Sequence, residues 1–226
     1  MPQISIIIPV YNAQKTLVQC LQSIFNQSFK NFEIIAINDG STDKSQKILT
    51  QYQNKITIVN QLNQGAAKAR NVGAKLARGE YIIFCDADII LNKNTLKTML
   101  EKLQKNPKTS YAYSAFKFGF KIFKLWPFSA KRLKQMPYIH TTSLIRAKDF
   151  PGFDKNLKRF QDWDLWLTIL ERGKRGIYIP EVLFTAKSGG TMSTWLPKSF
   201  YRLFPKNKKV KEYQAAEKII KAKHKL

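Results

Sequence analysis

Two acidic side chains follow an apolar run in the sequence Cys85-Asp86-Ala87-Asp88-Ile89. Carboxylates placed together at the end of a strand can hold Mn²⁺ or Mg²⁺, hard cations that leave coordination positions free for phosphate oxygens. A metal ion at Asp86 and Asp88 would neutralise charge on a departing nucleotide diphosphate. An Asp-x-Asp sequence is also frequent in solvated turns, so its meaning depends on which other polar loops lie beside it.

Polar residues also follow the first two apolar runs of the chain, in Pro9-Val10-Tyr11-Asn12 and in Asn38-Asp39-Gly40-Ser41-Thr42-Asp43. Asp39 can accept a hydrogen bond from the N–H of a base, and Gly40 permits close approach of the backbone. The same residue types are typical of a capped turn. Both a nucleotide-binding loop and an ordinary turn are therefore compatible with this segment.

Charged residues at two later helix starts complete the candidate set. Lys68 or Arg70 could contact a diphosphate, but side chains two positions apart on a helix diverge, so we expect at most one to face a ligand. Asp162 and Asp164 flank Trp163 in the sequence. A carboxylate beside an aromatic side chain suits a base that deprotonates an acceptor hydroxyl, and the indole of Trp163 could stack on a sugar. Each assignment has an alternative. Lys68 and Arg70 could be solvated cations, Asp162 and Asp164 could be carboxylates favoured by the helix dipole, and Trp163 could be packed in the core.

Apolar periodicity predicts the elements that position these residues. Short β-branched runs alternate with amphipathic segments, which predicts strands at 4–8, 33–37, 56–59 and 81–85 and helices at 17–25, 43–52 and 66–77. This alternation favours an α/β fold with a mostly parallel central sheet flanked by helices. Ligands are then expected beyond the carboxyl ends of the strands.

The second half of the chain is less regular. Helices are expected between Asn94 and Pro107 and between Asp162 and Gly173. Aromatic, basic and Pro/Gly residues mix without a clean period in 110–160, which predicts a substrate-facing insertion or a partly ordered lid. The Lys-rich end of the chain predicts an amphipathic helix over 210–222.

The charge of the chain is strongly unbalanced, since 39 Lys and Arg residues oppose 15 Asp and Glu residues. Residues 117–134 hold six cations and no anion, and 198–226 hold ten cations and two anions. A positive field attracts nucleic acid, an anionic membrane or a phosphorylated substrate. The aromatic and basic mixture at 116–126 favours an anionic membrane surface, contacted through 116–134 and 198–226. A solvated tail or a generally basic proteome is an equally good explanation.

Length and cysteine usage bound the remaining possibilities. The 226 residues fit one domain with a short appendage. Cys20 and Cys85 each lie in an apolar stretch, so we expect two small core residues and no disulfide. The sequence shows neither a signal peptide nor an apolar run of roughly 20 residues. We therefore expect a cytoplasmic protein that can attach peripherally to the inner face of the cell membrane.

Five motifs, taken in order and spacing, resemble family 2 glycosyltransferases. They are Ser5-Ile6-Ile7-Ile8-Pro9-Val10-Tyr11-Asn12, Asn38-Asp39-Gly40-Ser41-Thr42-Asp43, Ala69-Arg70-Asn71-Val72-Gly73, Gly79-Glu80-Tyr81-Ile82 and Asp86-Ala87-Asp88. The resemblance implies the GT-A fold, with residues 1–197 as a single domain and 198–226 as a basic C-terminal tail. It also implies a nucleotide-sugar-binding half at 1–105 and an acceptor-side half at 106–197.

The resemblance implies a role for each motif residue. Pro9, Tyr11 and Asn12 would line the nucleotide pocket, Asp39 would read the nucleobase, and Arg70 would support the nucleotide. Asp86 and Asp88 would hold the ribose and the metal, with Asp88 as the direct metal ligand. Asp162 would be the catalytic base.

Two positions depart from the family pattern. Gln161 stands where the family has a glutamate before the base, and loss of that negative charge should slightly lower the proton affinity of Asp162. The segment 185–193 lacks the histidine of the family, so any contact it makes with metal or diphosphate would pass to Lys187 or be lost.

We therefore expect an inverting, metal-dependent glycosyltransferase. It would move a sugar from a nucleotide-diphosphate sugar, expected to be a UDP-sugar, to a hydroxyl of a glycan or lipid-linked acceptor in cell-envelope polysaccharide or glycolipid synthesis. The alternative is a catalytically impaired nucleotide-sugar-binding protein or a basic nucleic-acid-binding protein on the same fold. Nucleic acid is disfavoured as a partner because it does not explain Asp39, Asp88 and Asp162 together. A nucleotidyltransferase is disfavoured because 11–14 is not a Gly-rich, Arg/Lys-containing loop.

Overall fold

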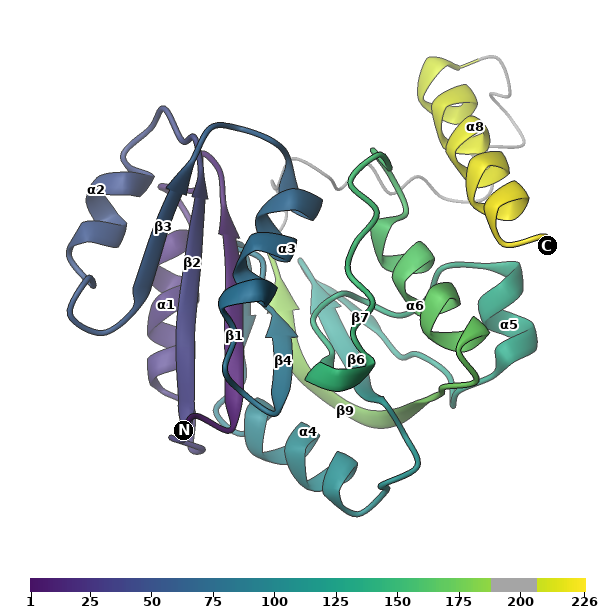
Figure 1. Cartoon of the computed structure of the whole chain (residues 1–226), viewed down its shortest axis with the longest axis horizontal. Coiled ribbons are helices and arrows are strands. Elements are labelled where there is room, and N and C mark those ends of the chain that lie inside the picture. Colours follow the sequence, from purple (N-terminus) through teal and green to yellow (C-terminus); the bar gives the residue numbers. More distant parts are fainter. Residues whose placement is uncertain (188–206) are drawn as a thin grey trace.

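The computed structural model describes residues 1–187 and 207–226 (Figure 1). The strands are β1 (Ile4–Val10), β2 (Phe32–Asp39), β3 (Thr57–Gln61), β4 (Tyr81–Phe84), β5 (Ile89–Leu91), β6 (Tyr111–Phe118), β7 (Lys121–Phe123), β8 (Leu144–Arg146) and β9 (Gly176–Ala186). The helices are α1 (Leu17–Phe25), α2 (Ser45–Thr50), α3 (Ala66–Leu76), α4 (Thr95–Gln104), α5 (Ala130–Gln135), the short 3₁₀ helix η1 (Ala147–Asp149), α6 (Gln161–Glu171) and α8 (Lys208–Lys223).

One sheet runs through the molecule in the order β3-β2-β1-β4-β8-β6-β9-β5, with β7 paired to β6. Strands β3, β2, β1 and β4 are mutually parallel, as the alternation of apolar runs and helices predicts. Ile6 and Ile8 of β1 pack with one hydrophobic cluster and Ile7 with another, because successive strand side chains point to opposite faces. A strand buried on both faces reads as a continuous apolar run, which explains why these strands are visible in the sequence.

Beyond β4 the sheet becomes mixed. Strand β8 is antiparallel to β4 and β6, whereas β6 and β9 are parallel and β9 is antiparallel to β5. The α/β prediction is confirmed, but the parallel arrangement holds without exception only for the first half of the chain. The prediction that 110–160 is irregular is wrong, because this segment supplies β6, β7, β8 and α5. Strand β6 escapes the sequence pattern because its buried first five residues, Tyr111-Ala112-Tyr113-Ser114-Ala115, mix aromatic, small and polar types and form no β-branched run.

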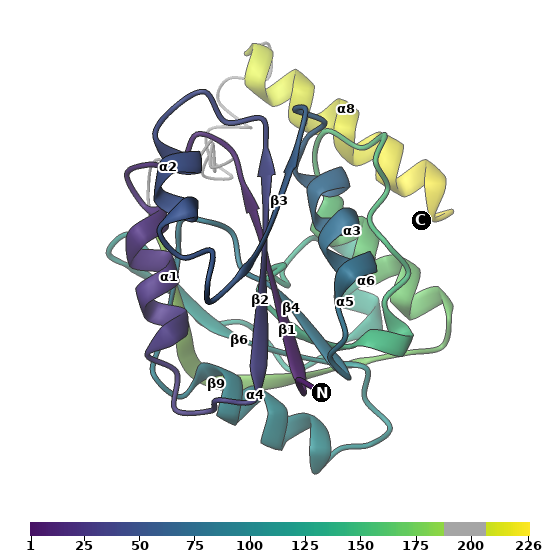
Figure 2. The same cartoon turned by 60° about the vertical axis from the view of Figure 1, so that its left-hand side comes forward.

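Helices cover the two faces of the sheet (Figure 2). Helices α1 and α4 contribute to the hydrophobic cluster on one face, and α5 and α6 contribute to the cluster on the other. Helix α3 lies so close to β1 that a Cβ atom on Gly73 would be 2.4 Å from Cγ2 of Ile7. This close contact fixes the residues at the start of α3 relative to the carboxyl ends of the strands.

The basic end of the chain is partly folded onto the domain. Helix α8 contains the predicted amphipathic helix, and Val210 and Ile220 on it are fully buried. Ile220 belongs to the same hydrophobic cluster as α6, so 207–226 is packed against the domain and is not a free tail. The predicted domain boundary at 197 and the first part of the predicted tail, 198–206, lie outside the described residues.

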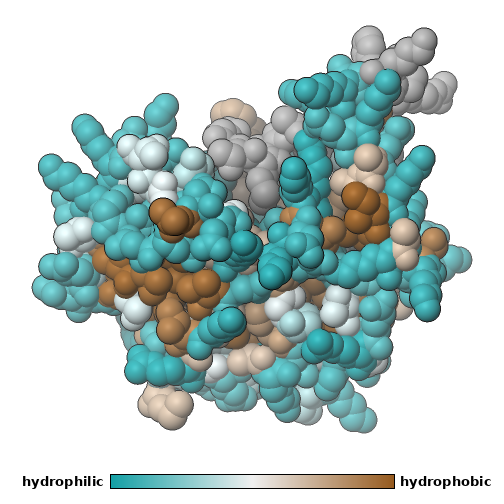
Figure 3. All heavy atoms as spheres, turned by 45° about the horizontal axis from the view of Figure 1, so that its top comes forward, coloured by the Kyte–Doolittle hydropathy of each residue, from teal (hydrophilic) through white to brown (hydrophobic). Residues whose placement is uncertain are grey.

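Cys20 and Cys85 are buried and not bonded to each other, with their Sγ atoms 3.8 Å apart, as expected for core residues. Among the described residues, no helix is both long and apolar enough to cross a membrane. Hydrophilic side chains cover most of the face seen in Figure 3.

Candidate functional site

The loops that follow β1 and β2 are joined to each other by side-chain hydrogen bonds. The Asn12 side-chain oxygen accepts from the Thr42 N–H at 2.8 Å, and the Asn12 N–H donates to Ser41 Oγ at 3.1 Å. Asn12 adopts φ 48°, a left-handed conformation that asparagine tolerates better than most residues. Tyr11 beside it is 45% exposed and Pro9 is half-buried. The structure therefore brings these predicted pocket residues to one accessible loop pair.

Asp39 lies at the end of β2 but does not face solvent. Its side chain accepts hydrogen bonds from the Gln61 side chain at 2.6 Å, the Gln64 N–H at 2.9 Å and the Gly65 N–H at 2.8 Å. The residue is only 2% exposed. In this arrangement the carboxylate holds the loop that precedes α3, and the reading of a base by Asp39 stays a prediction.

Arg70, in the second turn of α3, connects two separate parts of the chain. One guanidinium nitrogen lies 2.7 Å from Asp86 Oδ1, and another donates to Gln161 Oε1 at 3.1 Å. The guanidinium also lies 5.3 Å from the ring centroid of Phe153. Arg70 is 1% exposed, so its guanidinium is engaged inside the protein, and its support of the nucleotide stays a prediction. It instead positions Asp86 and the first residue of α6 in one site.

Asp86 and Asp88 follow β4 and lie at the carboxyl end of the parallel strands. Asp86 is neutralised by Arg70, whereas no described side chain forms an ion pair or a hydrogen bond with the Asp88 carboxylate. Burial, reinforced by the negative charge of Asp86, raises the pKa of Asp88 to about 6. The Lys187 N–H donates to the Asp88 carbonyl at 3.1 Å, so the end of β9 lies beside this pair.

The chemistry of these two carboxylates fits a divalent metal. A raised pKa means that negative charge at Asp88 is uncompensated, and a hard cation with oxygen preference would relieve it. Within the described parts of the chain no group of three or more His, Cys, Asp or Glu side chains is arranged to hold a metal ion. A metal at Asp88 would thus need further ligands from a bound diphosphate or from water.

Asp162 is the second residue of α6 and is half-buried. Burial raises its pKa, while the Trp163 N–H, which donates to Asp162 Oδ1 at 2.8 Å, and the charge of Arg70 oppose the rise. Asp86 also acts on this pKa and raises it. The predicted base and the predicted metal pair are therefore close enough to interact electrostatically.

Trp163 does not face a substrate, and the prediction that it stacks on a sugar is wrong. Its ring is 1% exposed and packs in the cluster between the sheet and α5 and α6. Its indole N–H donates to the Leu133 carbonyl at 2.6 Å. The indole has no free polar group and no accessible face, so core packing is its role.

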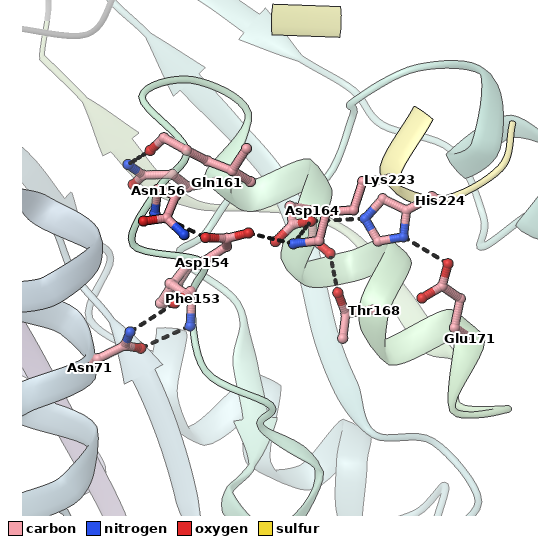
Figure 4. A network of polar contacts seen from close by, with 11 residues as sticks. Asn71, Phe153, Asp154, Asn156, Gln161, Asp164, Thr168, Glu171, Lys223 and His224 are labelled. Atoms are coloured by element: carbon pink, nitrogen blue, oxygen red, sulfur yellow. Dashed lines mark hydrogen bonds and ion pairs between the residues drawn. The ribbon is translucent and has the colours of Figure 1, made fainter. Parts of the chain in front are cut away.

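A polar network fixes α6 from its outer side (Figure 4). His224 bridges Asp164 Oδ1 at 2.8 Å and Glu171 Oε1 at 2.7 Å, and Lys223 lies 2.7 Å from both Asp154 and Asp164. The side chains of His224 and Asp164 are 2% and 3% exposed. The end of α8 is therefore held to α6, the helix whose second residue is the predicted base.

The start of α6 is also supported. Phe160, directly before the helix, has φ 59°, an unusual backbone conformation that persists only where surrounding contacts enforce it. Its ring meets Trp163 edge-on at 5.6 Å and Tyr213 of α8 at 4.9 Å. Nearby, Asn71 of α3 exchanges two hydrogen bonds of 2.8 Å with the backbone of Phe153 (Figure 4).

We expect His224→Ala to lower the free energy of unfolding by about 1–3 kcal/mol, because it removes one partner of the buried Asp164 carboxylate. Urea denaturation measures this change. Lys218→Ala, at an exposed position of the same helix, is the matched control and should change stability by less than about 0.5 kcal/mol. Equal stabilities of the two variants would show that the network contributes nothing to the fold.

His140 is a residue that the sequence analysis did not single out and on which the charges of Asp86 and Arg70 act. Its ring packs beside the stacked rings of Phe116 and Phe184, with centroids 5.3 and 5.0 Å away, and its Nδ1 accepts the Thr142 N–H at 3.0 Å. Burial lowers its pKa to about 4, with Asp86 and Arg70 acting on it in opposite senses. A neutral ring that accepts at Nδ1 carries its proton on Nε2. Only its place in a short polar run before β8 could have suggested it.

Known proteins resemble this chain in sequence and in fold. A family model described as glycosyl transferase family 2 matches residues 5–162. Glycosyltransferase GlyG of Streptococcus pneumoniae is 40% identical over 106 residues, which are 45% of this chain and 35% of GlyG. In GlyG and three further curated relatives the match spans only 27% to 44% of the relative's own length.

Solved structures resemble the chain over most of its length. S. aureus TarS 1-349 in complex with UDP-GlcNAc superposes with a TM-score of 0.72 at 23% identity, covering 90% of this chain and 64% of that one. The mannosyltransferase PcManGT from Pyrobaculum calidifontis, in complex with GDP-Man and Mn²⁺, superposes with a TM-score of 0.68 at 18% identity, covering 86% and 59%. The neighbours are GT-A fold glycosyltransferases, so these likenesses establish the fold.

Proposed function

The chain belongs to glycosyl transferase family 2, and from this premise we propose that it transfers a sugar from a nucleotide-diphosphate sugar to a hydroxyl group of an acceptor, with inversion at the anomeric carbon. The observation that carries the proposal is the position of Arg70, which holds Asp86 at 2.7 Å and the start of α6 at 3.1 Å. These two contacts support a site that combines a donor-side carboxylate pair with a base on the acceptor side.

The donor is proposed to lie across the carboxyl ends of β1, β2 and β4. Pro9, Tyr11 and Asn12 line the nucleotide pocket, and Asp39 acts indirectly by holding the loop that follows β3. Asp86 is proposed to hold the ribose. We propose a UDP-sugar because TarS, which shares the fold, is solved with UDP-GlcNAc. PcManGT is solved with GDP-Man, so the same fold also accepts a purine nucleotide. The identity of the nucleobase is therefore the least constrained part of the proposal.

The chemical step is proposed to use Asp162 as the base. Its carboxylate accepts the proton of the acceptor hydroxyl as that oxygen attacks the anomeric carbon opposite the diphosphate. The bond between this carbon and the diphosphate oxygen breaks, and the configuration inverts. Mn²⁺ or Mg²⁺ held by Asp88, with Asp86 beside it, would supply positive charge against the leaving diphosphate. Lys187, whose backbone contacts Asp88, is a further cation at this end of the site.

The acceptor is proposed to be a glycan or a lipid-linked sugar of the cell envelope. The net charge of +24 supports work at an anionic surface, to which 116–134 and 198–226 would contribute. Lys223 is already paired with Asp154 and Asp164, so the contribution of the basic end is smaller than its sequence suggests.

A screen of nucleotide sugars tests the proposal most directly. A donor that binds the native state raises the melting temperature, and the rise should depend on added Mn²⁺ or Mg²⁺. The donor that stabilises the protein should then be turned over to the free nucleotide diphosphate in the presence of acceptor. Stabilisation without any turnover would favour the alternative of a catalytically impaired nucleotide-sugar-binding protein. Gln161 and the inward-facing Asp39 are the two features of the site that make this outcome worth testing.

The glutamine at 161 gives a prediction about pH dependence. Gln161→Glu adds a negative charge beside Asp162 and should raise its pKa further, because a like charge disfavours the ionised base. The base acts deprotonated, so activity is lost as pH falls through its pKa. The acidic limb of kcat/KM should therefore move to higher pH, with about threefold lower activity on that limb.

The matched control is Gln161→Ala, which removes the hydrogen bond to Arg70 without adding charge. It should lower kcat while leaving the acidic limb near its original position. If the acidic limb of kcat/KM for Gln161→Glu coincides with that of the unsubstituted protein, the ionisation of Asp162 does not determine this limb.

A further inference from the structure

The β6–β7 turn and the residues that follow it expose an unusual concentration of large apolar side chains. We call residues 117–126 the aromatic hairpin. Phe120 at its turn is fully exposed, and Ile122 and Trp126 are 52% and 40% exposed. Lys121 and Lys124 are exposed between them. Scattered exposed apolar residues need no explanation, but several within one short segment mark an interaction surface.

The sheet places this hairpin beside the proposed donor site. Phe118 of β6 is in register with Ala186 of β9, and Ala186 is in register with Ile89 of β5, the residue after Asp88. Adjacent strands lie about 4.8 Å apart, so Phe118 and Ile89 are separated by roughly 10 Å.

Backbone hydrogen bonds continue this connection past the end of β6. The Gly119 N–H donates to the Ala186 carbonyl at 3.3 Å, and the N–H of the next residue, Lys187, donates to the Asp88 carbonyl at 3.1 Å. The exposed turn at Phe120 and the carboxylate pair therefore lie at the same edge of the sheet.

The aromatic hairpin is positively charged, and Trp126 at its end is held in place by neighbouring side chains. The sequence has no acidic residue between Glu101 and Asp149. The Arg132 guanidinium lies 4.8 Å from the Trp126 ring centroid, and the Trp126 carbonyl accepts the Tyr113 O–H at 2.8 Å. Charge complementarity therefore favours an anionic partner that also accepts apolar side chains.

We propose that the aromatic hairpin binds an anionic lipid bilayer, with Phe120 and Ile122 in the interfacial region and the ammonium groups of Lys121 and Lys124 at the headgroup phosphates. Apolar side chains beside flexible cationic stems suit this interface. A soluble glycan would account for the rings but not for the aliphatic side chain or the cations. The proposal rests on the proposed function in one respect, since it brings the donor site to a lipid-linked acceptor.

Cosedimentation with vesicles tests the proposal without any turnover. The unsubstituted protein should bind vesicles of phosphatidylcholine and phosphatidylglycerol and bind those of phosphatidylcholine alone much less. Joint substitution of Phe120→Ser and Ile122→Ser should weaken binding to the mixed vesicles about tenfold, because two apolar side chains no longer enter the interface. Phe120→Trp should retain binding. Leu62→Ser, at a position that is 85% exposed outside the hairpin, is the matched control and should bind normally.

Equal vesicle binding by the double variant and the control would overturn the proposal, as would binding to a soluble glycan or an oligonucleotide in place of vesicles. Vesicle binding without sugar transfer from any donor would refute the proposed function and leave the hairpin proposal intact. Sugar transfer to a soluble acceptor without vesicle binding would refute the hairpin proposal and leave the proposed function intact.

Discussion

Asp162→Asn should abolish sugar transfer while leaving the affinity for the nucleotide-sugar donor unchanged. The substitution keeps the size of the side chain but removes its ability to accept a proton, and loss of a general base costs about 10²- to 10⁴-fold in rate. Asp162 Oδ1 accepts the Trp163 N–H at 2.8 Å, and the amide oxygen of asparagine can keep this bond. Turnover with a saturating donor, together with donor binding by calorimetry, measures the two effects separately.

The pH profile adds a second criterion for the same residue. Burial raises the pKa of Asp162, so activity should be lost on acidification above the usual aspartate range. The residual activity of Asp162→Asn should show no such limb. Asp154→Asn is the control, because Asp154 pairs with Lys223 outside the proposed reaction path and should keep most of the activity. Near-normal turnover by Asp162→Asn would remove it as the base.

The first half of the fold could be predicted because its information is local. Each of β1, β2, β3 and β4 lies within or overlaps an apolar run bounded by turn residues, and each is followed by polar residues whose place at the strand end follows from parallel topology. The second half depends on pairing between distant segments. Strand β6 pairs with β9 at separations of 65 to 68 positions, and a shift in register near Ser114 interrupts any simple pattern.

The types of residue in the site could also be predicted, but not the directions of their side chains. Arg70 and Asp39 belong to the expected set, yet both point into the protein. The partner of Arg70 lies 91 positions away at Gln161, and no spacing rule reveals such a contact. His140 shows the same limit, since it lies in a segment without recognisable period and yet the charges of Asp86 and Arg70, far away in the sequence, act on its pKa.

The contact between Arg70 and Gln161 changes the meaning of the departure at position 161. A glutamate there would share the guanidinium with Asp86 as a second anion, whereas Gln161 keeps the hydrogen bond at 3.1 Å and leaves the charge of Arg70 to Asp86 alone. Gln161 therefore holds the start of α6 to Arg70 without adding a charge to the site. This supports retained activity with a shifted pH dependence over loss of function.

Asp88→Ala should eliminate metal-dependent donor binding. Loss of residues that merely orient metal ligands costs about 10- to 100-fold in affinity, so loss of a direct ligand should cost at least about 100-fold. The fold around the site should persist, because Asp86 remains held by Arg70 at 2.7 Å. Titration of the donor with and without Mn²⁺ measures the effect.

The pKa of Asp88 also predicts how metal affinity varies with pH. Without metal this pKa is about 6, and only the deprotonated carboxylate binds a cation. Metal-dependent donor binding should therefore be constant well above pH 6 and should weaken about tenfold for each pH unit below it. A chelator should reduce donor binding by the unsubstituted protein to the level of Asp88→Ala and leave that variant unchanged. If neither the chelator nor the substitution weakens donor binding, the donor is bound without a metal, and neutralisation of the leaving diphosphate falls to cations of the chain such as Lys187.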